Sequence, residues 1–245
     1  MIKPGYSIFF LVQLVFFYTS CDINLKRGNG NITSREVEVE AFEHMSIGGN
    51  YNVVLIRSDE SKVVLSTDEN LLRYINVEAR DGKLSINNVH NLNGTDGISV
   101  EVFYNELNSI YSSGTSRIQH EGPMQSAELL VDLSGAGAID LDIETSRVEV
   151  NLSGAGVIDL SGETDVLEVR ISGAGGLMAA DLQSVECNIR LSGLGGAEIF
   201  VTEKLIASIT GVGGIEYGGN PKMIEKQITG FGKIERAKEY LEESE

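Results

Sequence analysis

A glycine that follows serine or threonine recurs through the second half of this chain at nearly constant spacing. Seven such glycines are separated by intervals of 21, 19, 19, 20, 18 and 19 residues. They are Gly114, Gly135, Gly154, Gly173, Gly193, Gly211 and Gly230. Self-similarity at a fixed period is the sequence signature of repeat architectures, so this spacing constrains the fold more than any other feature of the chain.

Apolar residues keep fixed positions within these units. The residue two before the glycine is aliphatic in six units, and the residue four before it is apolar in five, with a polar residue between them. The first column is Leu133, Leu152, Ile171, Leu191, Ile209 and Ile228, and the second is Val131, Val150, Val169, Ile189 and Ala207. This alternation predicts a strand with one buried face. A third apolar column, four residues after the glycine from Ile118 to Ile234, predicts a second strand beyond the bend.

A unit of this size, holding two or three short strands, can bury its apolar face only by stacking on copies of itself. Like residues then form ladders with a spacing of about 4.8 Å, and glycine suits the bend between strands. We therefore predict an all-β fold, a single-stranded right-handed parallel β-helix (solenoid) with coils of about 19 residues. The signatures of leucine-rich repeats and of calcium-binding GGxGxD repeats are missing from the sequence.

Residues 1–20 have the pattern of a signal peptide. Lys3 precedes an apolar run at 8–18, which is too short to span a bilayer core of about 30 Å. Cys21 follows Tyr18-Thr19-Ser20, which resembles a bacterial lipoprotein signal except that Tyr18 stands where Leu is usual. We predict lipidation of Cys21; the alternatives are an ordinary cleaved signal and an uncleaved anchor. Residues 21–34 are polar and rich in Gly and Asn, which predicts a lipidated cysteine followed by a flexible tether.

The folded body is predicted at residues 35–236, and a polar tail at 237–245. Before the repeats, β-branched and aromatic runs at 52–56, 62–67, 75–79, 83–86 and 98–104 predict further strands. Helices are expected only at 69–74 and in the charged tail. The segment Arg35–Ile56 and the residues after Ile234 are expected to cap the two ends of the stack. Uncapped coil ends expose strand edges, so homo-oligomers through the ends are a further possibility.

The formal net charge of −17 limits the partners of this chain. Nucleic-acid binding depends on Lys and Arg displacing counterions, so DNA and RNA are not expected partners. Lying on an anionic bilayer would require a basic amphipathic face, which the sequence lacks. Contact with a membrane is therefore expected only through the lipid anchor at Cys21.

Four parts of the chain together match a known pattern. They are the segments 35–56 and 63–86, the SGAG units that follow Leu133, Leu152 and Ile171, and the segment 218–234. In order and spacing they resemble the putative auto-transporter adhesin, head GIN domain family of Bacteroidetes-type bacteria, over roughly residues 35–236. Many members have Ser-Gly-Ala-Ser where this chain has Ser-Gly-Ala-Gly. The resemblance implies a right-handed β-helix with an adhesin-like role and supplies no catalytic residue and no cofactor.

A column of carboxylates lies five residues after the repeat glycines. Its members are Asp140, Asp159, Glu198, Glu216 and Glu235, with Gln119 at its start and Met178 interrupting it. Neighbouring charges at coil spacing repel by about 1 kcal/mol in water, so the column is interpreted as a solvated face. These five residues are also the candidate Ca²⁺ ligands. A calcium-dependent polysaccharide lyase is the enzyme alternative, although Arg170 and Arg190 occupy a different column.

Other reactive groups give weaker indications. Cys187 is interpreted as a structural thiol at an outward or turn-adjacent position, and no intramolecular disulfide is possible if Cys21, the only other cysteine, is acylated. The three histidines, His44, His90 and His120, lack metal-ligand spacing. The Ser/Thr column beside the glycines is interpreted as a ladder of hydroxyls bonded to turn backbone. No catalytic residue, metal site or cofactor is predicted with these groups.

The sequence thus favours a non-enzymatic, adhesin-like lipoprotein of the cell envelope that presents a repetitive surface to a glycan or protein ligand. The outer membrane or cell surface is favoured over the inner membrane. A structural role in the periplasm and a calcium-dependent, polysaccharide-active enzyme remain as alternatives. Repetition without a cluster of unlike catalytic groups favours the first two, because stacking produces long, regular surfaces.

Overall fold

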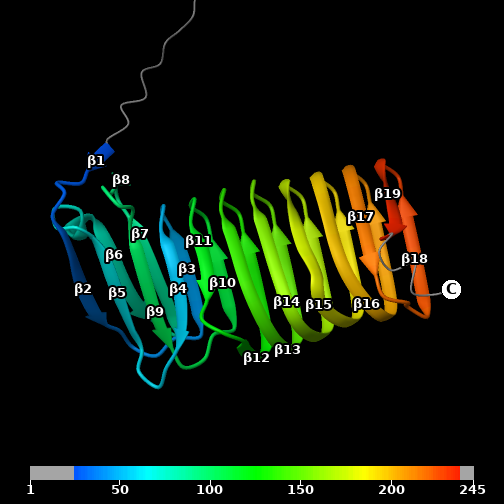
Figure 1. Cartoon of the computed structure of the whole chain (residues 1–245), viewed down its shortest axis with the longest axis horizontal. Helices are drawn as coiled ribbons and strands as arrows, with labels where there is room; N and C mark the ends of the chain where they lie inside the picture. Colours follow the sequence, from blue (N-terminus) through cyan, green and yellow to red (C-terminus); the bar gives the residue numbers. More distant parts are fainter. Residues whose placement is uncertain (1–24, 238–245) are drawn as a thin grey trace, which may run out of the picture.

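The computed structural model describes residues 25–237, which form a β-solenoid (Figure 1). Its N-terminal elements are β1 (Leu25–Arg27), β2 (Ile32–Glu38), β3 (His44–Gly48), β4 (Asn52–Arg57), β5 (Lys62–Asp68), the 3₁₀ helix η1 (Leu72–Tyr74), β6 (Ile75–Arg80), β7 (Lys83–Asn88), β8 (Asn91–Asn93) and β9 (Ser99–Tyr104). The repeats supply β10 (Ser109–Ser112), β11 (Arg117–His120), β12 (Met124–Leu133), β13 (Ala138–Leu152), β14 (Val157–Ile171), β15 (Ala174–Leu191), β16 (Leu194–Ile209), β17 (Val212–Gly218), β18 (Met223–Ile228) and β19 (Phe231–Arg236).

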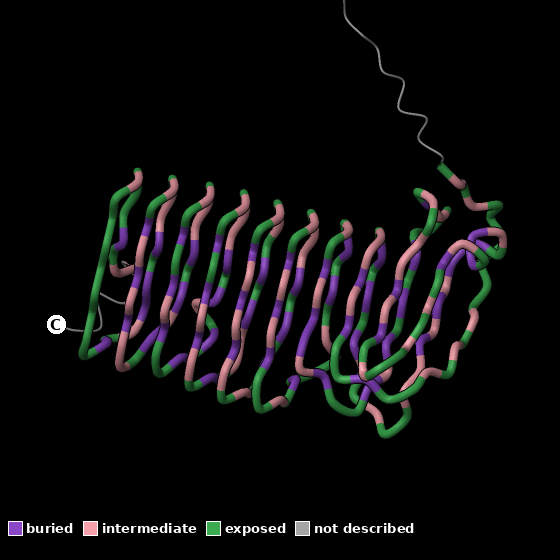
Figure 2. The backbone as a smooth tube through the Cα atoms, turned by 180° about the vertical axis from the view of Figure 1, so that it is seen from behind, coloured by how far each residue is buried: buried purple, intermediate pink, exposed green. Residues whose placement is uncertain are grey.

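The repeats stack as predicted. Every pairing between β10 and β19 is parallel, and the coils repeat about every 19 residues. Leu133 pairs with Leu152, which pairs with Ile171, so the aliphatic column predicted from the sequence is a ladder in the structure. These side chains are at most 1% exposed, and purple stripes of buried residues run through successive coils in Figure 2. The solenoid prediction is confirmed.

The uneven glycine intervals correspond to irregularities in the ladder. The 20-residue interval spans β15, where the register against β14 shifts by one residue between Met178 and Leu182. The following interval of 18 residues spans the shorter β16, and two further register shifts lie between these strands. A residue gained in one coil is accommodated as a β-bulge, so the aliphatic columns on either side remain aligned.

The glycine corner is crowded because the backbones of successive coils touch there. A Cβ on Gly154 would lie 1.8 Å from the carbonyl oxygen of Gly135, and a Cβ on Gly173 would lie 2.0 Å from that of Gly154. No side chain fits at these distances, which explains why glycine recurs once in every coil. Gly49 belongs to the same ladder, since the Thr115 N–H donates to its carbonyl oxygen at 2.8 Å.

The N-terminal part has a different topology. Both β3 and β4 lie between later strands: β10 and β7 flank β3, while β11 and β9 flank β4. The chain therefore begins the solenoid at an inner coil, formed by β3 and β4. It then builds the N-terminal end of the stack with β5 to β9 and returns to add β10 and β11 on the other side of β3 and β4. The predicted cap at Arg35–Ile56 was wrong for His44–Ile56, because these residues pair on both sides within an inner coil.

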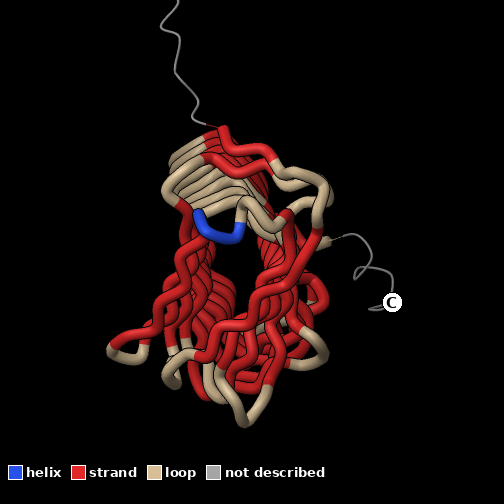
Figure 3. Tube along the Cα trace, turned by 90° about the vertical axis from the view of Figure 1, so that its left-hand side faces the viewer, coloured by secondary structure: helices blue, strands red, loops and turns tan. Residues whose placement is uncertain are grey.

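The N-terminal cap consists of antiparallel strands. Strand β5 pairs antiparallel with β9 and with β2, and β6 pairs antiparallel with β7. Between them, η1 crosses the end of the core (Figure 3) and buries Leu71 and Leu72. We call β2, β5, η1 and β6 the N-terminal cap. The expected helix at 69–74 is thus a single 3₁₀ turn.

Ordered structure begins earlier than predicted. The expected flexible tether covered residues 21–34, but Leu25–Arg27 pair with β8, and Ile32–Ser34 pair with β5. The buried Asp68 carboxylate holds this segment, since it accepts hydrogen bonds from the N–H groups of Gly30 at 2.6 Å and Thr95 at 2.7 Å. The predicted signal peptide, Cys21 and residues 238–245 lie outside the described residues. Within the described range, no helix is long and apolar enough to cross a membrane.

Candidate functional site

The predicted acidic column lies along one side of the solenoid, next to the glycine corner. Its members stand in register from coil to coil: Asp140 pairs with Asp159, Asp159 with Met178, and Glu198 with both Met178 and Glu216. Glu216 pairs in turn with Glu235. All of these side chains are exposed, so the structure brings the five predicted carboxylates into one solvated line.

The carboxylates repel one another, most clearly near Asp159. Partial burial raises the pKa of Asp159, and the charges of Asp140 and Asp181 raise it further. Asp140 receives a hydrogen bond from the Gln119 amide at 3.2 Å. Across residues 25–237, no group of three or more His, Cys, Asp or Glu side chains is arranged to hold a metal ion.

An exposed apolar ridge runs parallel to the acidic column. Leu194, Val212 and Phe231 each follow a repeat glycine directly and pair in register across three coils. Their exposed fractions are 59%, 47% and 81%, which is unusual for large apolar side chains aligned side by side. We call these three residues the apolar ridge. The ridge can be seen in the sequence at the position directly after each repeat glycine, where Ala136, Ala155 and Ala174 are followed by Leu194, Val212 and Phe231 in later coils. This change was missed in the sequence analysis.

A groove floored by glycine separates the ridge from the carboxylates. Gly176, Gly196 and Gly214 stack in register, and with Met178 and Glu198 they line a hollow of about 310 Å³. We call this hollow, with the glycines that floor it, the glycine groove. The apolar ridge, the glycine groove and the acidic column together form what we call the groove face.

The floor glycines differ from the glycines that directly precede them in the chain, such as Gly213. A Cβ on Gly214 would meet nothing within 4 Å, and one on Gly176 would come no closer than 3.6 Å to another atom. By contrast, a Cβ on the adjacent Gly213 would lie 1.7 Å from the Gly195 carbonyl oxygen. Packing therefore requires glycine at Gly213 and does not require it at Gly176 or Gly214, where glycine instead keeps the groove open.

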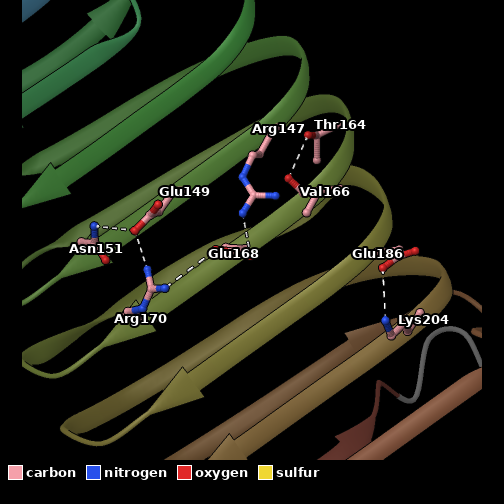
Figure 4. Close-up of polar contacts among 9 residues, drawn as sticks. All are labelled: Arg147, Glu149, Asn151, Thr164, Val166, Glu168, Arg170, Glu186 and Lys204. Carbon is pink, nitrogen blue, oxygen red and sulfur yellow. Dashed lines mark hydrogen bonds and ion pairs between the residues drawn. The ribbon is translucent and has the colours of Figure 1, made fainter.

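A second face carries ion pairs between coils (Figure 4). Arg147 binds Glu168 at 2.7 Å, and Arg170 binds Glu149 and, at 3.8 Å, Glu168. Arg170 also pairs in register with Arg190, in a column separate from the carboxylates of the groove face. The predicted separation of these arginines from the acidic column is confirmed. Arg170 forms ion pairs with two glutamates on this second face. It therefore does not stand beside Asp140 and Asp159, where the basic residue of a lyase would be needed.

The histidines have structural partners. The His44 Nδ1 lies 2.8 Å from the Ser109 hydroxyl, and the His120 Nε2 lies 2.6 Å from the Tyr104 hydroxyl. The His90 ring packs edge-on against Tyr74 at 5.2 Å between centroids. They lie in separate parts of the fold, in agreement with the interpretation of the histidines as scattered.

Cys187 is buried, not outward-facing as predicted. It is 2% exposed and stacks between Leu167 and Leu205 in an aliphatic column. The prediction failed because the inward-facing alternation before Gly193 continues past Ile189 to Cys187, whereas the predicted apolar columns ended four residues before the glycine. Burial raises the pKa of the Cys187 thiol, so the thiolate is disfavoured and the residue is a core side chain.

Hydroxyl ladders support the bends. Beside the glycine corner, the hydroxyls of Ser113, Ser134 and Ser192, three of the seven residues in the predicted ladder, each donate to a carbonyl of the adjacent coil at 3.4 Å. A second ladder, missed from the sequence, follows the opposite bend: the Thr145 hydroxyl donates to the Arg147 carbonyl at 3.0 Å, and the Thr164 hydroxyl donates to the Val166 carbonyl at 3.3 Å. At later coils the hydroxyls of Ser184 and Thr202 donate instead to carbonyls of neighbouring coils, those of Phe200 and Ser184. These hydroxyls therefore bond to backbone at the bends.

Comparison with solved structures finds the same fold in bacterial proteins. A putative adhesin from Bacteroides fragilis has a TM-score of 0.83 and 20% identity, with 86% of this chain and 100% of that chain covered. A putative adhesin from Parabacteroides distasonis has a TM-score of 0.72 and 22% identity, with 87% and 100% covered. A putative lipid binding protein from the same organism has a TM-score of 0.70 and 25% identity, with 87% and 100% covered.

Comparison at the level of sequence identifies a family. No curated protein matches the chain. A family model matches residues 41–221, which include the inner coil at β3 and β4, the N-terminal cap from β5 onward and the repeats through β17. Since this match covers well over half of the sequence, the chain belongs to the family described as putative auto-transporter adhesin, head GIN domain.

Proposed function

We propose that this protein is a non-enzymatic, adhesin-like binding module of the cell envelope and that the groove face is its binding surface. The observation that carries the proposal is the apolar ridge: Leu194, Val212 and Phe231 are exposed in register across three coils. Exposed apolar side chains that gather in a row rimmed by polar residues mark interaction sites more often than scattered ones do.

The shape of the groove face favours an extended ligand. Two adjacent coils carry the same three features, an apolar side chain, a floor glycine and a carboxylate, at the strand spacing of about 4.8 Å. They are Leu194, Gly196 and Glu198 in one coil and Val212, Gly214 and Glu216 in the next. A chain-like glycan or an extended polypeptide lying across these two coils would meet equivalent contacts on both, with apolar contact to the ridge and hydrogen bonds to Glu198 and Glu216. The unpaired carboxylates favour a neutral or cationic ligand over an anionic one.

Three observations support a binding role over catalysis. Among the described residues that line the glycine groove, Glu198 and Glu216 are the only ionisable side chains. Arg170 is engaged in ion pairs on another face. The family is described as putative auto-transporter adhesin, and the structural neighbours are described as putative adhesins or as a putative lipid binding protein.

Display at the cell surface depends on the N-terminal segment. We propose that Cys21 is lipidated after removal of residues 1–20 and that the solenoid is held at the outer membrane. Cys21→Ala should move the protein from the membrane fraction to the soluble fraction. Protease added to intact cells should digest the wild-type solenoid if it faces outward, and protection would favour the alternative of a structural periplasmic protein.

The binding role is tested with the soluble body, residues 22–245, on arrays of glycans and matrix proteins, together with lipid vesicles because one neighbour is described as lipid binding. Gly214→Phe fills the glycine groove and Leu194→Ser interrupts the apolar ridge, so each should abolish binding to any ligand that the wild type captures. Met223→Ser removes an equally exposed apolar side chain outside the groove face and should have no effect. Binding that survives Gly214→Phe and Leu194→Ser would exclude the groove face.

A further inference from the structure

The last coil, formed by β18 and β19, ends the stack without a further strand. Within the described residues, β18 pairs only with β16, and β19 pairs only with β17. Ile224 and Ile228 continue the columns of Leu205 and Ile209, yet each is 45% exposed whereas Leu205 and Ile209 are fully buried. The end of the core is therefore an apolar surface bordered by open strand edges, the arrangement that invites a second copy to add its own strands.

One charged residue interrupts this surface. Lys226 pairs in register with Ala207 and so occupies the inner, apolar column of the repeat. Its ammonium group crosses the end of the core toward the other sheet, where it donates to the Tyr217 hydroxyl at 3.0 Å and lies 4.5 Å from the centre of the Tyr217 ring. A lysine in this column is unique among the units in which the sequence repeat aligns.

The same ammonium also engages the open edge of β19. It donates to the Ile234 carbonyl oxygen at 3.2 Å. The N–H groups of Phe231 and Ala237 bond to the preceding coil, and alternate residues of a strand direct their polar groups to opposite sides. The Ile234 carbonyl therefore lies on the free side of β19, where an added strand would otherwise bind it.

We propose that Lys226 closes the C-terminal end of the solenoid against a second copy of this chain. Two copies meeting through β18 with two-fold symmetry would pair antiparallel, with inner-face residues opposite one another. The register that sets Ile224 against Ile228 of the other copy also sets Lys226 against its own counterpart. Two like charges directly opposite in adjacent strands oppose pairing, so the most apolar contact is the one that Lys226 blocks.

The test is the mass of the full chain in solution. Wild-type protein is expected to sediment as a monomer, and Lys226→Ile is expected to sediment as a concentration-dependent dimer. Lys226→Met serves as a second variant that keeps the long stem over Tyr217 without the charge, and it is expected to associate as well. Melting curves of each variant establish that it is folded.

Two controls separate the position from the charge. Lys233→Ile makes the same replacement on the outer face of the same coil and should remain monomeric. Lys226→Glu restores a like charge opposite its own copy and should also remain monomeric. The proposal is overturned if folded Lys226→Ile and Lys226→Met stay monomeric at all concentrations, or if the wild type already dimerises through β18.

Discussion

At its N-terminal end the solenoid carries three antiparallel strands and a 3₁₀ turn, whereas at its C-terminal end no strand of residues 25–237 pairs with the outer side of the last coil. The N-terminal cap buries Leu71 completely, while Ile224 in the last coil is 45% exposed. One end is closed by added structure and the other by the charge of Lys226. Stacking thus buries the apolar core in the middle of the molecule, but at each end the core is exposed and is protected in a different way.

The largest expected effect concerns the coils between the two ends. Gly154→Ala places a Cβ within 1.8 Å of the Gly135 carbonyl oxygen, so the two coils must separate at the corner. We expect a loss of more than about 3 kcal/mol in the free energy of unfolding, measured by urea titration. Gly214→Ala, which meets no atom, should change it by less than about 0.5 kcal/mol. Equal losses would show that the corner is not tightly packed.

The two ends should differ in their sensitivity to loss of apolar side chains. Leu71→Ala removes a fully buried side chain from beneath the N-terminal cap and should cost about 2–5 kcal/mol. Ile224→Ala removes a half-exposed side chain from the last coil and should cost less than about 1 kcal/mol. Similar losses from the two substitutions, measured by the same titration, would mean that the C-terminal end is covered as completely as the N-terminal end.

The N-terminal cap should respond to acid. Hydrogen bonds to Asp68, led by the one from the Thr95 N–H, lower the pKa of its carboxyl group below the ordinary value, against the opposing effect of burial. A group with a lowered pKa stabilises the fold above its unfolded pKa, and that stability is lost as the pH falls through its folded pKa. We therefore expect the hydrogen-exchange protection factors in β1 and β8, which allow for the intrinsic pH dependence of exchange, to fall below about pH 4, the unfolded value.

Asp68→Asn provides the matched control for this acid response. It should accelerate exchange in β1 and β8 already at neutral pH and flatten the pH dependence there. Exchange in β14, which is remote from Asp68, should be unchanged. An acid response of β1 that persists in the variant would assign the effect to another group.

The smallest expected effect is in the acidic column. Burial, Asp140 and Asp181 raise the pKa of Asp159, so its ionised form destabilises the fold. Stability from this group is present below its unfolded pKa and is lost as the pH rises through its folded pKa. Asp159→Asn should therefore raise the free energy of unfolding at neutral pH by no more than about 0.5 kcal/mol, because the site is exposed. A loss of stability would show that the carboxylate has an attractive partner.

The sequence predicts the middle of the molecule well because each coil repeats the contacts of the last. Leu133, Leu152 and Ile171 could be aligned from spacing alone, and the column from Asp140 to Glu235 follows from the same period. Gly49 was missed because its ladder partner, Gly114, lies 65 residues later in the chain. A repeat interval cannot show that the chain enters at an inner coil, since that order depends on which strands pair in space.

The functional surface was predicted only in part. The acidic column was found because carboxylates stand out in a sequence, whereas the apolar ridge was overlooked because Leu194, Val212 and Phe231 read as ordinary core residues. Their exposure follows from their place immediately after the corner glycine, on the outer side of the bend. Cys187 shows the converse error, because the inward-facing alternation before Gly193 extends two residues further back than the predicted columns did.

The central claim, that coils stack in parallel with like positions in register, can be tested by disulfide trapping in a background that lacks Cys21 and Cys187. Arg170 and Arg190 pair in register across the bulged coil, so their Cα atoms lie at about the strand spacing, within the range a disulfide spans. Arg170→Cys with Arg190→Cys should form an intramolecular disulfide on mild oxidation, whereas Arg170→Cys with Ser192→Cys should remain reduced. The opposite result would contradict the register and with it the groove face.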